Sequence, residues 1–140
     1  MSWLLDTPVL SELIRATPKE SVIDWLQAQD ENDLFLSVLT LGELEKGIAK
    51  LSDSRRKTTL RKWVRTNLMA RFETRVLVID HNVASRWGTL VGTSERKGRP
   101  LPVIDSLIAA TAIAHELTVV SRNAKDFERC GIPCLNPWSG

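Results

Sequence analysis

Ser2-Trp3-Leu4-Leu5-Asp6-Thr7-Pro8 joins an apolar run to the beginning of a helix, with an acid at the junction. Residues 2–5 have the length and apolarity of a buried strand. Thr7 suits the N-cap of the following helix and Pro8 suits its first position, which predicts a helix over residues 7–15. A strand that passes directly into a helix is the repeating step of an α/β fold, and here it places Asp6 at the carboxyl end of the strand.

The same step recurs along the chain. Apolar runs predict further strands at residues 34–37, 75–79 and 118–120, and residues 133–135 can add a short fifth one. Apolar residues at helical spacing predict helices in the intervals, starting at Pro18, around residues 41–51 and 60–72, and over residues 82–97 and 105–115. We therefore predict one α/β domain over residues 1–140, with a central, mostly parallel sheet of four to five strands flanked by helices.

The composition of the chain is that of a single globular domain. The chain has 140 residues, of which 43% are hydrophobic and 26% charged, and its net charge is +2. No apolar run reaches about 18 residues and no signal-peptide pattern is present, so we expect a cytoplasmic protein with no membrane contact. Cys130 and Cys134, spaced C-G-I-P-C, match neither a redox motif nor a zinc ribbon, so we expect two reduced thiols.

Polar residues with metal-binding or water-orienting side chains stand where an α/β sheet places its functional groups. Asp6 ends the first predicted strand and Asn123 follows the fourth, while Glu43 and Asp105 lie in the first turns of helices. Functional groups of open α/β sheets collect outside the carboxyl ends of the strands, so connectivity alone can bring these four residues together. A carboxylate cluster suits Mg²⁺, which can activate water for phosphodiester cleavage.

Each acid also has a purely structural explanation. Asp6 can simply end a strand and shape the turn. Thr40 and Glu43 have the T-x-x-E spacing of a capping box, and Asp105 can act as a helix N-cap. Asp80 follows a strand just as Asp6 does, and composition alone does not separate the two.

Four motifs in the same order resemble those of PIN-domain nucleases, and most closely those of VapC-type toxins from bacterial toxin–antitoxin pairs. They are Leu4-Leu5-Asp6-Thr7, Leu36-Ser37 with Glu43-Leu44, residues 103–112 around Asp105, and Val120-Ser121-Arg122-Asn123 with Asp126-Phe127. The resemblance runs nearly end to end and includes the terminal Asn136-Pro137-Trp138.

This resemblance implies an endoribonuclease that depends on Mg²⁺ or Mn²⁺, cleaves structured RNA such as tRNA or ribosomal RNA, and is held by a cognate antitoxin. It implies that Asp6 and Asp105 are the main metal ligands and that Glu43 holds a metal-bound water or a second ion. Asp80 matches no acid of the family and is left out of the site. The resemblance also implies a homodimer, for which the apolar sides of the early helices are the expected interface.

Two positions depart from the family pattern. Pro8 stands where the family usually has Asn, which removes an amide that would help order the site. Asn123 stands where a fourth acid is common, so it can orient water but brings no negative charge. Asp126 can supply this missing charge only if its short segment turns toward the site. Ser121 is a further candidate site residue whose role the motif does not define.

A basic strip without any acid runs from Ser54 to Phe72. We expect it to contact RNA phosphates through Arg55, Arg56, Lys57, Arg61, Lys62 and Arg65, although a solvated helix face would have the same composition. Arg96, Lys97 and Arg99 form a second, smaller basic cluster.

Two other functions stay open at this point. Leu-Leu-Asp-Thr after a strand also resembles phosphatases with a nucleophilic aspartate, but their D-x-D motif is broken here by Pro8. A catalytically weakened PIN domain that binds RNA or an antitoxin without cutting is the other alternative.

Overall fold

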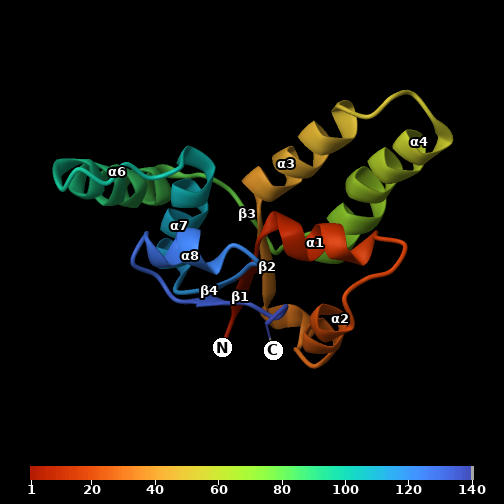
Figure 1. The fold of residues 1–140 in the computed structure, drawn as a ribbon, viewed down its shortest axis with the longest axis horizontal. Coiled ribbons are helices and arrows are strands. Elements are labelled where there is room, and N and C mark those ends of the chain that lie inside the picture. Colours follow the sequence, from red (N-terminus) through yellow and green to blue (C-terminus); the bar gives the residue numbers. More distant parts are fainter. Residues whose placement is uncertain (140) are drawn as a thin grey trace.

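A parallel five-stranded sheet forms the centre of the structure, a computed structural model that describes residues 1–139 (Figure 1). The strands lie in the order β3-β2-β1-β4-β5, and every neighbouring pair is parallel. Their bounds are β1 Trp3–Leu5, β2 Leu34–Ser37, β3 Val76–Leu77, β4 Thr118–Val120 and β5 Cys134–Leu135. The predicted α/β fold with a parallel sheet is confirmed.

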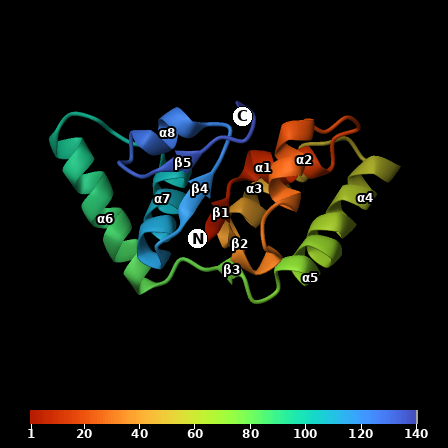
Figure 2. The ribbon, with the colours of Figure 1, turned by 90° about the horizontal axis from the view of Figure 1, so that it is seen from below.

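Helices connect the strands and lie on both sides of the sheet. On one side are α1 Thr7–Leu13, α2 Glu20–Gln27, α3 Val38–Ala49, α4 Arg55–Lys62 and α5 Met69–Phe72; on the other are α6 His81–Arg96, α7 Val103–His115 and α8 Ala124–Glu128 (Figure 2). A 3₁₀ turn spans Glu31–Asp33, and a π-helical segment, Trp63–Leu68, joins α4 to α5. Within residues 1–139, no helix has both the length and the apolarity that crossing a membrane requires.

Alternate residues of the central strands fill two separate cores. Leu5 and Val120 pack into a core with α1 to α5, whereas Leu4 and Val119 pack into a second core with α7 and α8. Successive side chains of a strand point to opposite faces, so strands buried on both faces are apolar throughout. The carboxyl ends of β1 and β4 therefore emerge between two layers of helices.

The structure contradicts two of the structural explanations for the acids and shows a structural role for Asp80. The capping box is wrong: Ser37 is the N-cap of α3, its Oγ accepting from the Leu39 N–H at 3.1 Å, while Thr40 is buried inside the helix. Asp105 is not an N-cap either, because α7 begins at Val103. Asp80 does cap a helix, since its Oδ1 accepts from the Val83 N–H at 2.9 Å, and leaving it out of the site agrees with this role.

Several predicted boundaries shift. Thr7 is already helical and Asp6 occupies the N-cap position of α1, one residue before the prediction. The strand predicted at 75–79 is confined to Val76–Leu77, since Val78 is largely exposed. The helix predicted through 60–72 contains a π-helical segment, and the short helix α8 was not predicted at all.

Candidate active site

Asp6 lies buried at the carboxyl end of β1, with only 3% of its surface exposed. The Ser121 hydroxyl, just after the neighbouring strand β4, donates to Asp6 Oδ2 at 2.7 Å. The backbone N–H of Asp6 donates to the Val120 carbonyl at 2.9 Å and continues the parallel pairing of β1 with β4. Sheet pairing thus fixes both residues at the same edge, and Ser121, which the motif left open, contacts the first acid directly.

Glu43 reaches the same edge from α3. The Thr7 hydroxyl, one residue after Asp6, donates to Glu43 Oε1 at 2.6 Å. This hydrogen bond joins the start of α1 to the first half of α3 and holds the Glu43 carboxylate beside the strand end. The sequence prediction missed this role of Thr7, although a hydroxyl directly after a strand-end acid is the signal that could have indicated it.

Asp105 lies half-buried in the first turn of α7. The turn is fixed by Ser106, whose hydroxyl donates to the Val103 carbonyl at 2.9 Å and accepts from Trp87 Nε1 at 3.0 Å. Since Trp87 belongs to α6, packing of α6 against α7 determines where Asp105 is placed.

The four carboxylates of Asp6, Glu43, Asp105 and Asp126, here called the acidic site, interact through their charges. Burial raises the pKa of Asp6 to about 6, and Asp105 and Glu43 add to the increase, against hydrogen bonds from the Ser121 hydroxyl and the Thr7 backbone. Burial also raises the pKa of Asp105, with further contributions from Asp126 and Glu43. Charge interactions therefore connect Asp6, directly after β1, with acids of α3, α7 and α8.

Asn123 and Asp126 follow β4 on the segment that leads into α8. The backbone N–H of Asn123 donates to Ser121 Oγ at 3.0 Å, while the Asn123 residue is exposed. Asp126, in the first turn of α8, lies close enough to Asp105 to raise its pKa. Asp126 therefore lies within electrostatic range of Asp105.

The donor set of the acidic site fits a hydrated divalent cation. None of its four carboxylates forms an ion pair with a described Lys, Arg or His side chain, although Asp6 is buried. Uncompensated buried charge is costly, and a cation would relieve it. Within residues 1–139 no group of three or more His, Cys, Asp or Glu side chains is placed so that it could hold a metal ion together. An ion such as Mg²⁺ needs no such group, because it keeps several waters and takes only one or two carboxylates.

The basic strip divides into two kinds of residue. Arg56 and Glu43 line one pocket of about 250 Å³, and Arg55 and Arg56 line an adjoining pocket of about 490 Å³. By contrast, Lys57 forms an ion pair with Asp53 at 3.3 Å, and Arg65 forms one with Glu45 at 2.7 Å. Arg61 and Lys62 are the last two residues of α4. Arg56, at the start of α4, is therefore the predicted cation that lines a pocket together with Glu43.

Comparison with known proteins agrees with this geometry. A model of the PIN domain matches residues 3–132 of the chain. The chain belongs to the PIN-domain family. This PIN domain is 37% identical to plasmid stability protein StbB of Pseudomonas syringae pv. tomato, over 96% of the chain and 97% of StbB.

Two further similarities extend over almost the whole PIN domain. VapC ribonuclease Y4jK of Sinorhizobium fredii is 33% identical, over 96% of both chains, and toxin FitB of Neisseria gonorrhoeae is 34% identical, over 96% of this chain and 97% of FitB. The crystal structure of FitAcB from Neisseria gonorrhoeae superposes with a TM-score of 0.91 at 34% identity, covering 97% of this chain and 98% of that chain.

Proposed function

We propose that this PIN domain is a metal-dependent endoribonuclease and the toxin of a toxin–antitoxin pair. The observation that carries the proposal is the acidic site, in which a buried Asp6 carboxylate lies among three further acids without a protein counter-charge in the described part of the chain. Relatives of similar length that are named as a ribonuclease and as a toxin support the same assignment.

The proposed roles follow from where each side chain lies. Asp6 and Asp105 are the groups that would hold Mg²⁺ or Mn²⁺, since oxygen donors suit both ions. A bound ion of this kind makes water more acidic and offsets the charge that develops on the phosphate. Glu43, held by the Thr7 hydroxyl, orients water or binds a second ion.

Ser121 and Asp126 complete this proposal. The Ser121 hydroxyl fixes the orientation of the Asp6 carboxylate. Asp126 supplies from α8 the negative charge that Asn123 lacks, and Asn123 remains available to orient water.

We further propose structured RNA, such as tRNA or ribosomal RNA, as the substrate, and a cognate antitoxin as the protein partner. This substrate would place the enzyme in the cytoplasm. We also expect a homodimer, which static light scattering would report as twice the mass of one chain.

The test is cleavage of total tRNA and ribosomal RNA by the purified chain in Mg²⁺ or Mn²⁺, in chelator, and with Asp105→Asn. The matched control is Glu95→Gln, which neutralises an exposed acid of α6. The proposal predicts cleavage by the wild type and the control, abolished by chelator and reduced at least ~100-fold by Asp105→Asn.

Equal products from the wild type and Asp105→Asn would contradict the assignment of the site. RNA binding without cleavage under every condition would instead support the non-catalytic alternative, for which Asn123 in place of a fourth acid is the favouring observation.

A further inference from the structure

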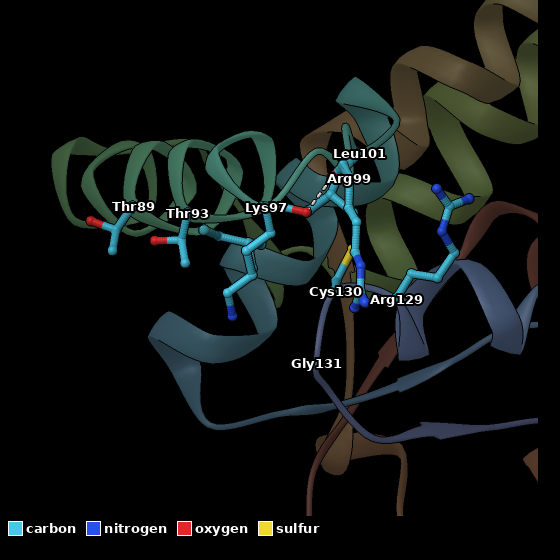
Figure 3. A pocket seen from close by; sticks show the side chains of 10 residues that line it. Thr89, Thr93, Lys97, Arg99, Leu101, Arg129, Cys130 and Gly131 are labelled. Atoms are coloured by element: carbon cyan, nitrogen blue, oxygen red, sulfur yellow. Dashed lines mark hydrogen bonds between the residues drawn. The ribbon is translucent and has the colours of Figure 1, made fainter.

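A second group of cations surrounds a pocket on the side of the sheet opposite to the basic strip. This basic pocket has a volume of about 320 Å³ and lies between the end of α6 and the end of α8 (Figure 3). Its lining contains Lys97, Arg99, Arg129, Cys130 and the hydroxyls of Thr89 and Thr93, and it contains no acidic residue.

The backbone brings these cations together from segments that are distant in the sequence. After α6 ends, the chain folds back, and the Arg99 N–H donates to the Ser94 carbonyl at 2.9 Å. The Arg129 guanidinium donates to the Pro100 carbonyl at 3.4 Å and so links the end of α8 to the same loop. Figure 3 shows the Arg99 side chain extending toward Cys130, while the Lys97 side chain extends from the end of α6 to one side of it.

The charges in the basic pocket are not neutralised by the described residues. None of Lys97, Arg99 and Arg129 forms an ion pair within residues 1–139, whereas Lys57 and Arg65 of the basic strip each have an acidic partner. Like charges around one small pocket repel one another, and a bound anion relieves this repulsion. Guanidinium, ammonium and hydroxyl groups are the donors that proteins use to bind phosphate oxygens.

The basic pocket adjoins the acidic site through α8. Asp126 lies four residues before Cys130, and the Cys130 thiol donates to the Asp126 carbonyl at 3.4 Å. Burial raises the pKa of the Cys130 thiol, with Asp105 and Asp126 adding to the increase and Arg129 opposing it. Cys130, in the lining of the basic pocket, therefore lies within electrostatic range of Asp105, Asp126 and Arg129.

We propose that the basic pocket binds a backbone phosphate of the RNA that is cut in the acidic site, at a nucleotide beside the scissile phosphate. This inference rests on the proposed function and adds a phosphate-binding position for its substrate. RNA would then be held from both sides, by the start of α4 on one flank and by the basic pocket on the other, with the acids between them.

The test compares Lys97→Gln/Arg99→Gln with Lys19→Gln/Arg86→Gln, which removes the same charge from exposed residues outside the pocket lining and outside both groups of basic residues. Binding of a fluorescent single-stranded RNA is measured by anisotropy in chelator, over a series of salt concentrations, so that cleavage is not required. Inorganic phosphate is titrated separately as a small-anion probe, and thermal unfolding of all chains is recorded.

We expect the pocket variant to bind RNA about 10-fold more weakly and to lower the salt slope by ~0.7, which corresponds to the loss of one phosphate contact on a single strand. The control should stay within twofold of the wild type. A pocket variant whose RNA affinity and slope equal those of the control overturns the inference. The inference is also overturned if the pocket variant loses only its binding of inorganic phosphate. The same holds if it loses only thermal stability, through the lost charge at the end of α6.

These outcomes are separate from those of the proposed function. If the wild type cleaves RNA and the pocket variant binds RNA normally, the nuclease assignment stands and the pocket assignment fails. If the wild type neither binds nor cleaves RNA, both fail together.

Discussion

Asp6 illustrates, at the scale of one residue, how function opposes stability in this fold. Its carboxyl group is buried without a counter-charge, and its pKa rises from 3.8 to about 6. Below the unfolded pKa the group is protonated in both states. Between the two values the folded state binds more protons, so stability falls as pH rises, and above the folded pKa the full penalty of roughly 3 kcal/mol is present.

We therefore predict that Asp6→Asn stabilises the metal-free protein at neutral pH. The amide carries no charge and its oxygen can still accept the Ser121 hydroxyl, so the free energy of unfolding should increase by about 1–3 kcal/mol in chelator. Near pH 4 the same variant should change it little. Urea unfolding followed by tryptophan fluorescence measures both values, with Asp24→Asn as an exposed control. Destabilisation by Asp6→Asn at neutral pH would contradict this account of the acid.

At the scale of helices and strands, the contact between α6 and α7 positions Asp105. The Ser106 hydroxyl is fully buried and is the acceptor for Trp87 Nε1. We predict that Ser106→Ala costs about 1–3 kcal/mol of folding free energy, because it leaves the indole N–H without a partner.

In a Trp87→Phe background the same substitution should cost less, and a double-mutant cycle by chemical denaturation measures the difference. Identical costs in the two backgrounds would show that this hydrogen bond does not join the helices.

The helices and strands also show how much of the structure could be predicted from the sequence. Long periodic helices and apolar strands were predictable, because burial on both faces of a parallel sheet leaves a clear pattern. Helix α8, with five residues, is too short for a periodic signal. The position of Asp126 was therefore open in the sequence, since it depends on how α8 packs against α7. Likewise, T-x-x-E spacing at Thr40 and Glu43 could not reveal that Thr7, thirty-six residues earlier, is the hydroxyl partner of Glu43.

At the scale of the whole molecule, positive charge lies on two flanks of the acidic site. Helix α4 and helix α6 stand at opposite ends of the molecule, with the sheet between them (Figure 2). The net charge of only +2 does not indicate these two basic regions, because acids elsewhere in the chain, some of them in ion pairs, offset the positive charge.

We predict that Arg55→Glu/Arg56→Glu/Arg61→Glu flattens the salt dependence of RNA binding, lowering the slope by ~2 for three lost phosphate contacts. Reversing the charge of Arg65 alone should change the salt slope less than reversing the charge of Arg56 alone, because Arg65 already forms an ion pair with Glu45. Anisotropy titrations over a salt series decide this. An unchanged slope in the triple variant would leave the basic strip as a solvated helix face.

The central claim is that acids from separate elements form one metal centre, and Mn²⁺ binding to the whole chain tests it most directly. Calorimetric titration of Mn²⁺ should show saturable binding to the wild type and to Glu95→Gln. The account predicts that Asp6→Asn and Asp105→Asn each weaken this binding at least ~10-fold, although the two residues lie in different elements. Equal Mn²⁺ affinity in all four proteins would contradict the account.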